Sequence, residues 1–277
     1  MESKNYIVII AIVLASILLS GCIINKINPN DINQNEVIPD ESNGYGNNLS
    51  IACWNLQIFG LTKASNETLL NYYAEKLDDF DIFILQEIRD ASGAAIETFA
   101  EKFPNHHYII SKRAGRSSSK EQYAVFYNKR ATLIDSYDYT LEYQQEIQRP
   151  PLQVTFTSNN WTFSLYTIHT QPDNVSNELS ILETITGKPL NDTIILGDLN
   201  ADGKYYDEEN IAHYTDWLWV VSNDFDTTVA PNDNTYDRII INNATLNNFI
   251  RVGVINDITK MQSDHYIVYA VFSNEFR

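Results

Sequence analysis

Cysteine and basic residues are both scarce in this sequence. Its 277 residues include only two cysteines, Cys22 and Cys53, which excludes a disulfide-dense scaffold and a zinc site built from four cysteines. Lysine and arginine number 19 against 36 aspartates and glutamates, so the formal net charge is −17. Because non-specific nucleic-acid binding depends on phosphates neutralised by lysine and arginine, this charge argues against a protein that coats nucleic acid. An enzyme that meets one phosphodiester at a local basic patch remains compatible with it.

The hydrophobic residues are sufficient for a large folded domain. They make up 44% of the chain, and aromatic residues make up 12%, which excludes a wholly disordered protein. The length allows one large domain or two small ones.

The N-terminus has the layout of a signal peptide. Lys4 precedes an apolar run of 13 residues from Ile7 to Leu19, which is short for a membrane-spanning helix. The following Leu-Ser-Gly-Cys22 resembles the lipobox of prokaryotic lipoproteins. We therefore predict a signal peptide over residues 1–21 and lipidation of Cys22, with an uncleaved membrane anchor as the alternative. Both readings place the protein outside the cytoplasm, anchored to the cell membrane.

Residues 22–48 are rich in Asn, Asp, Pro and Gly and show no apolar periodicity. They are predicted to form a flexible, disordered polar tether. The catalytic unit is then residues 49–277, a length that suits one domain.

Hydrophobic periodicity in residues 49–277 predicts many strands and few helices. The strands are expected near residues 49–55, 81–87, 108–111, 122–127, 132–139, 152–157, 162–169, 193–199, 236–241 and 266–272. Helices are expected near residues 65–77, with Ser65 as the cap, and near 90–102, 175–187 and 207–221. This mixture predicts an α/β or α+β sandwich of four layers, in which two packed mixed sheets are flanked by helices.

Unusual polar residues stand at five of the predicted strand ends. They are Asn55, Gln86-Glu87, His169, Asp198-Leu-Asn200 and Ser263-Asp-His265. Each alone is typical of a turn or a solvated edge, but together they offer hard oxygen ligands from several strands. Mg²⁺ and Mn²⁺ prefer such ligands, whereas one cysteine and well-spaced histidines do not suit a zinc cage.

Motifs along the whole domain resemble the deoxyribonuclease I family of the endonuclease/exonuclease/phosphatase superfamily. Gly197-Asp-Leu-Asn and Ser263-Asp-His are shared across the superfamily. Gly115-Arg-Ser-Ser-Ser-Lys-Glu and the pair Asp226-Thr-Thr and Tyr236-Asp-Arg point to the deoxyribonuclease I branch. The resemblance implies a deoxyribonuclease I-like fold and a divalent-cation-dependent endonuclease with little sequence specificity, which leaves 5′-phosphate ends. DNA is the implied partner, and no protein partner is predicted.

The resemblance also implies a role for each matching residue. His169 and His265 become the catalytic histidines, oriented by Glu121 and Asp237, because a carboxylate fixes the tautomer of an imidazole and raises its basicity. The remaining assignments are a cation site of Glu87, Asn55 and Asp264, and contacts from Asp198 and Asn200 to the metal or the scissile phosphate. Mg²⁺ or Mn²⁺ is the expected ion.

Substrate contacts are implied for Arg89, Arg149, Lys120, Arg116 and Tyr236. Residues 111–130 carry six basic side chains against the single carboxylate of Glu121, which suggests a strip that faces phosphates. Asp226 and Thr228 preserve part of a calcium site of the family.

The sequence departs from the family pattern at several positions. Ser119 replaces a loop tyrosine that enters the minor groove, Gln57 replaces an arginine, and Gly203 and Thr235 stand where the family has a disulfide. Engagement of DNA is thus expected to be weaker or differently placed. Because the catalytic core is common to the superfamily, a phosphodiesterase or phosphatase acting on lipid head groups or inositol phosphates is the alternative. A non-catalytic binding lipoprotein is a third hypothesis, which the survival of the complete residue set opposes.

Overall fold

The computed structural model describes residues 47–189, 191–210 and 212–275. The predicted signal peptide, Cys22 and most of the tether lie outside these residues, so those predictions stay predictions. Within the described residues, no helix combines the length and the apolar character needed to cross a membrane.

Twelve strands and five α-helices make up the described part of the chain. The strands are β1 (Asn48–Phe59), β2 (Ile82–Ile88), β3 (His106–Ile110), β4 (Gln122–Asn128), β5 (Thr132–Asp138), β6 (Leu152–Ser158), β7 (Trp161–Thr167), β8 (Asp192–Asp198), β9 (Leu218–Trp219), β10 (Asp237–Ile241), β11 (Phe249–Ile255) and β12 (Ile267–Ser273). The α-helices are α1 (Leu61–Ala64), α2 (Glu67–Leu77), α3 (Ala94–Ala100), α4 (Thr140–Tyr143) and α5 (Val175–Thr186). Short 3₁₀ turns lie at η2 (Pro172–Asn174), η3 (Glu208–Asn210) and η4 (Thr245–Asn247).

The strands form two mixed six-stranded sheets. One has the order β11-β12-β1-β2-β4-β3 and the other the order β5-β6-β7-β8-β10-β9. Each sheet contains one parallel pair, β1 with β2 and β7 with β8, and its other pairs are antiparallel. Parallel neighbours need a crossover, which α1 and α2 provide in the first sheet and η2 and α5 in the second.

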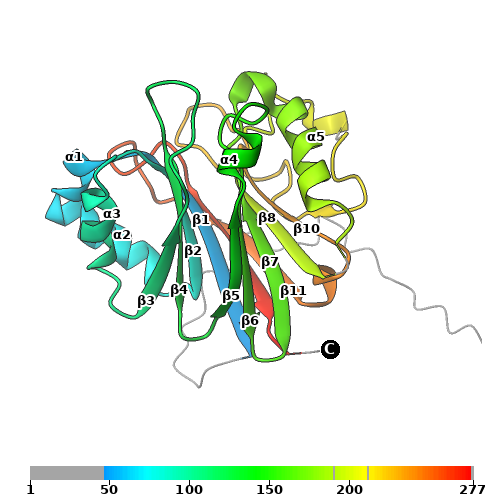
Figure 1. Cartoon of the computed structure of the whole chain (residues 1–277), viewed down its shortest axis with the longest axis horizontal. Coiled ribbons are helices and arrows are strands. Elements are labelled where there is room, and N and C mark those ends of the chain that lie inside the picture. Colours follow the sequence, from blue (N-terminus) through cyan, green and yellow to red (C-terminus); the bar gives the residue numbers. More distant parts are fainter. Residues whose placement is uncertain (1–46, 190, 211, 276–277) are drawn as a thin grey trace, which may run out of the picture.

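The two sheets pack face to face with helices outside, so the predicted four-layer fold is confirmed (Figure 1). Alternation along β1 explains the layers, since successive side chains of a strand point to opposite faces. Ile51 and Cys53 join the core between the sheets, whereas Ala52 and Trp54 pack into the cluster beneath α2 and α3. A third cluster lies between α5 and the second sheet.

Local predictions failed where tertiary pairing or capping overrides the pattern. The helix predicted near residues 207–221 is wrong, because that segment holds the turn η3 and the short strand β9, whose Trp219 pairs with Ile240 of β10. Strand β11 was not expected. The cap of α2 is Asn66 rather than Ser65, since the Asn66 side chain accepts the N–H of Leu69 at 3.1 Å.

Candidate active site

Polar side chains from both sheets meet at one edge of the molecule. Because β1 runs parallel to β2 and β7 to β8, their carboxyl ends point the same way, upward in Figure 1. Ligand sites in proteins with parallel strands commonly lie at such ends. The side chains gathered there are Asn55 of β1, Glu87 of β2, His169 after β7, Asp198 of β8, Asp237 of β10 and His265 before β12.

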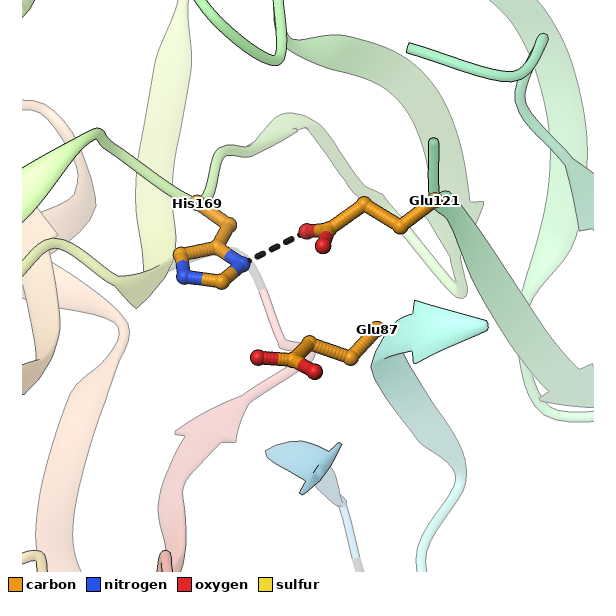
Figure 2. Close-up of side chains that lie close together, drawn as sticks. All are labelled: Glu87, Glu121 and His169. Carbon is orange, nitrogen blue, oxygen red and sulfur yellow. Dashed lines mark hydrogen bonds and ion pairs between the residues drawn. The ribbon is translucent and has the colours of Figure 1, made fainter. Parts of the chain in front are cut away.

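His169 is held in place by Glu121. Its Nδ1 lies 2.6 Å from Oε1 of Glu121 (Figure 2), and both residues are buried. The backbone N–H of His169 donates to the Tyr123 hydroxyl at 2.9 Å. Burial by itself raises the pKa of Glu121, but its interactions with His169, Arg149 and Arg89 outweigh it and lower that pKa below its ordinary value. The carboxylate therefore stays ionised and fixes the ring, leaving Nε2 toward the site.

His265 and Asp237 form a second pair of the same kind. Nδ1 of His265 lies 2.7 Å from Oδ2 of Asp237, which has no exposed surface. Burial by itself lowers the pKa of His265, but the carboxylates of Asp237 and Asp198 outweigh it and raise that pKa to about 10. His265 is therefore a protonated imidazolium at neutral pH.

Asp198 stands between the two histidines. Its Oδ2 is 3.3 Å from Nε2 of His169, 3.5 Å from Nε2 of His265 and 3.1 Å from Nδ2 of Asn55. Burial raises the pKa of Asp198, but the two imidazoles outweigh it and lower that pKa. Its Oδ1 accepts the backbone N–H of Asn200 at 3.1 Å. Two imidazoles that came from distant parts of the sequence thus direct their free nitrogens at one point.

The two sheets are joined directly beneath this point by Gln86. Its Oε1 accepts the N–H of Asp198 at 2.9 Å, and its Nε2 donates to the carbonyl of Ile168 at 2.9 Å. Gly197 makes this approach possible: its φ is +148°, and a Cβ there would lie 2.1 Å from the Ile168 carbonyl oxygen and 2.4 Å from Nε2 of Gln86. Sequence reasoning noted Gln86 at a strand end but gave it no role. An amide side chain at the end of an otherwise apolar strand is the sequence feature that could have indicated this role.

The Ser263-Asp-His265 segment is clamped onto β1. The indole N–H of Trp54 donates to the His265 carbonyl at 2.9 Å. Nζ of Lys63 donates to the carbonyls of Leu56 at 2.7 Å and Gln262 at 2.8 Å. Lys63, which sequence reasoning missed, thereby ties the end of β1 to the loop that carries His265.

The predicted cation ligands fall on two sides of the site. Within the described residues, one group of three His, Cys, Asp or Glu side chains brings its ligand atoms within 4.8 Å of one another, and it consists of Glu87, Glu121 and His169 (Figure 2). Asp264 instead lies beside His265, with its Oδ1 3.8 Å from Nε2. Asn55 donates its amide to Asp198 and accepts the Gln57 N–H through Oδ1 at 2.9 Å.

The chemistry of these donors fits a hard divalent cation. Carboxylate oxygens predominate, and Mg²⁺, Mn²⁺ and Ca²⁺ prefer oxygen ligands. Glu87 is the best placed of them, because Glu121 is already bound to His169 at 2.6 Å and to Arg149 at 3.3 Å. One oxygen of Glu87 accepts from the N–H of Ile58 and from Arg89, each at 2.8 Å, and its other oxygen remains for an ion.

The predicted substrate-binding arginines are largely engaged within the protein. Arg89 pairs with Glu87 and lies 3.6 Å from Glu121. Arg149 donates to the His169 carbonyl at 2.7 Å, and Arg116 donates to the side chains of two glutamines and to a backbone carbonyl. Their guanidinium groups therefore support the loops around the histidines.

The basic residues of segment 111–130 divide between the two ends of β4: Lys112, Arg113, Arg116 and Lys120 precede it, and Lys129 and Arg130 follow it. That they face phosphates stays a prediction. Strand β4 separates these two groups of basic residues by roughly 20 Å, at about 3.3 Å per residue. Arg130, beyond the far end of β4, lies 3.3 Å from Asp81. Lys120 precedes the near end and is exposed. The Tyr236 ring packs against Tyr205 at 5.7 Å between centroids.

The predicted calcium residues lie in the loop before β10. Oδ1 of Asp226 accepts the backbone N–H of Thr228 at 3.0 Å and that of Asn234 at 3.4 Å. Thr228 forms an isolated bridge with His265, so this loop braces the second histidine. Calcium binding there stays a prediction.

Residues 52–265 match the model of the endonuclease/exonuclease/phosphatase family. The chain belongs to this family. Deoxyribonuclease-1 of Bos taurus is 28% identical over 258 residues, which cover 80% of this chain and 92% of that protein. Deoxyribonuclease-1 of Homo sapiens is 28% identical over 256 residues and covers 80% and 91%, respectively. For Sus scrofa the identity is 30% over 217 residues, with 70% and 76% covered.

Solved structures share the fold at lower identity. A humanized D. rerio TDP2 with 14 mutations has a TM-score of 0.63 and 16% identity, covering 82% of this chain and 99% of that one. A mannosyl-6-phosphatase from Bacteroides thetaiotaomicron has a TM-score of 0.59 and 16% identity, covering 80% and 98%. D. rerio TDP2 complexed with a single-strand DNA product has a TM-score of 0.58 and 17% identity, covering 81% and 98%. The predicted deoxyribonuclease I-like membership of the endonuclease/exonuclease/phosphatase superfamily is confirmed.

Proposed function

We propose that this protein is a divalent-cation-dependent endonuclease that hydrolyses DNA phosphodiester bonds with little sequence specificity and leaves 5′-phosphate ends. The observation that carries the proposal is the pair of buried imidazoles, each held at Nδ1 by a carboxylate and each directing Nε2 at Asp198. One base and one acid on opposite sides of a phosphate are what in-line hydrolysis needs. The deoxyribonuclease-1 relatives and the DNA-bound TDP2 structure support DNA as the substrate.

The two histidines divide the proton transfers between them. His169, with Glu121 at Nδ1, accepts a proton at Nε2 from the attacking water as its oxygen bonds to phosphorus. His265 is the acid, because its raised pKa of about 10 keeps Nε2 protonated at neutral pH. It gives that proton to the departing 3′ oxygen as the P–O bond breaks, so the products are a 3′-hydroxyl and a 5′-phosphate.

The cation would be held by Glu87, with Asn55, Asp198, Asn200 and Asp264 contacting the ion or the phosphate. A divalent cation stabilises negative charge on the phosphoryl oxygens and orients the reacting groups.

Nicking of supercoiled plasmid tests this proposal. Purified protein is expected to nick plasmid in Mg²⁺ or Mn²⁺ and to stop when EDTA is added. End analysis should find 5′-phosphates. His169→Ala and His265→Ala are each expected to lower the rate by about 10²–10⁴-fold, the usual contribution of a general acid or base. Plasmid that remains intact with the native protein in both Mg²⁺ and Mn²⁺ would overturn the assignment.

A second function is favoured by one specific observation. Three large apolar side chains are exposed on two segments that Lys63 ties together: Ile58 at 57%, Leu61 at 56% and Met261 at 75%. The N–H of Ile58 donates to Glu87, so this apolar rim borders the candidate cation site. A substrate with an apolar part, such as the phosphodiester of a lipid head group, would suit such a rim.

A substrate panel separates the two functions. Sphingomyelin and phosphatidylcholine vesicles and inositol phosphates are incubated with the protein beside plasmid DNA. Head-group release with intact plasmid would favour the lipid phosphodiesterase, whereas nicking without head-group release favours the nuclease.

A further inference from the structure

A serine and a glutamate of α5 and a histidine from another segment form a hydrogen-bonded group, outside the site described above. Oγ of Ser176 lies 2.9 Å from Nε2 of His213, and Nδ1 of His213 lies 3.0 Å from Oε2 of Glu183. Ser176 and Glu183 come from the same helix, seven residues apart, and His213 reaches them from the loop before β9. None of the three belongs to the set assigned to phosphodiester hydrolysis.

His213 is firmly oriented within this hydrogen-bonded group. His213 is only 8% exposed, and its ring lies 6.1 Å from that of Tyr206 between centroids. The second oxygen of Glu183 accepts the backbone N–H of Tyr214 at 2.5 Å, which fixes the carboxylate against the loop. Ser176, in contrast, is exposed. Ser176 therefore lies at the surface, while its partner nitrogen is held from behind.

This order of groups is that of an activated serine. A base within hydrogen-bond reach of a hydroxyl removes its proton, and a third group that holds the other ring nitrogen fixes the tautomer and stabilises the imidazolium. Both distances lie in the range of about 2.6–3.2 Å expected for such pairs. Ser176 is also the second residue of a 12-residue helix, where the helix dipole favours developing negative charge.

We propose that Ser176, His213 and Glu183 form a second nucleophilic centre, which takes an acyl group from small activated carboxylic esters. Oγ of Ser176 attacks the ester carbonyl while its proton moves to Nε2 of His213. The bond to the leaving oxygen breaks, and that oxygen takes the proton from His213. Water then attacks the acyl-serine in the same way, releasing the carboxylic acid and restoring the serine. Ester and water are the only reactants.

The test uses the full chain and a fluorophosphonate probe, which phosphonylates activated serines with loss of fluoride. Mass spectrometry locates the label, and p-nitrophenyl acetate hydrolysis measures turnover. We expect the label at Ser176, no label there in Ser176→Ala, and labelling slower by about 10²-fold or more in His213→Gln, the usual contribution of a general base. The labelling rate of Glu183→Gln is expected to lie between those of the native protein and His213→Gln. Ser180→Ala is the matched control, because Ser180 is also exposed and lies one turn further along α5.

Plasmid nicking reports the fold in the same samples, since the three residues stand outside the proposed nuclease site. Ser176→Ala is expected to nick at the native rate. An unlabelled Ser176 in protein that nicks normally would overturn the proposal, as would equal labelling of Ser176 and Ser180 or an unchanged labelling rate in His213→Gln. If His213→Gln unfolds, as a loss of nicking would reveal, Glu183→Gln and Ser176→Ala still decide.

Discussion

Replacement of Asp237 by asparagine is a sharp perturbation of the proposed mechanism. The variant keeps the size of the side chain and removes its charge. Asp237 is fully buried 2.7 Å from Nδ1 of His265, so solvent does not screen the lost interaction. A hydrogen bond to a charged group contributes about 1.5–3 kcal/mol, and one pKa unit corresponds to about 1.36 kcal/mol. The pKa of His265, about 10 in the native protein, is therefore expected to fall by roughly one to two units.

The sign of the effect follows from the role of His265 as the acid. The proton that it gives to the 3′ oxygen is present below its pKa and lost above it. Native activity should therefore persist as pH rises toward about 10, whereas D237N should lose activity at a lower pH. Loss of ring orientation should add a fall of about 10²–10⁴-fold at neutral pH.

Initial rates of plasmid nicking at saturating Mg²⁺, measured from neutral pH to the pKa of His265, check this prediction. The matched control is Asp192→Asn. Asp192 begins β8, the strand that Asp198 ends, and accepts the indole N–H of Trp161 at 2.6 Å. We expect D192N to keep the native pH profile. A D237N enzyme with the native rate and the native alkaline limb would refute the reasoning.

Three further predictions follow from contacts around the site. Gly197→Ala should destabilise the protein by at least about 2 kcal/mol, because its Cβ would lie 2.1 Å from the Ile168 carbonyl oxygen; a melting curve like that of the native protein would contradict this. Lys63→Met should lower the nicking rate at least tenfold and raise the Mg²⁺ concentration for half-maximal rate, because Lys63 ties Leu56 to Gln262. Lys63→Arg should restore part of the rate. A Mg²⁺ titration of Lys63→Met identical to that of the native protein would oppose this role. Arg89, Arg116 and Arg149 are engaged internally, so binding of duplex DNA should release few counterions. For a catalytically inactive His169→Ala protein, the slope of log K against log salt should be shallower than about −3. A steep slope would show that these arginines turn outward to DNA.

Much of the fold was readable in the sequence because alternation of apolar residues is a local property. All ten predicted strands exist, and each places at least one apolar residue in or against the cores. The helix predicted near residues 207–221 failed for the opposite reason. There Tyr206, Tyr214 and Trp219 pack into the core beside α5, and pairing with β10 fixes the backbone as loop and strand. The spacing of the aromatic residues alone did not distinguish these outcomes.

The site was predictable as an inventory but not as an arrangement. The sequence by itself determined which chemical groups the site contains: two histidines and a set of carboxylates, in the order of the deoxyribonuclease I family. Only the tertiary structure decided that Nε2 of His169 and Nε2 of His265 converge on Asp198, that the arginines bind the protein itself, and that Ser176 meets His213. Sequence separation does not constrain distance once two sheets pack, because hydrogen bonds such as those of Gln86 join strands that are far apart along the chain.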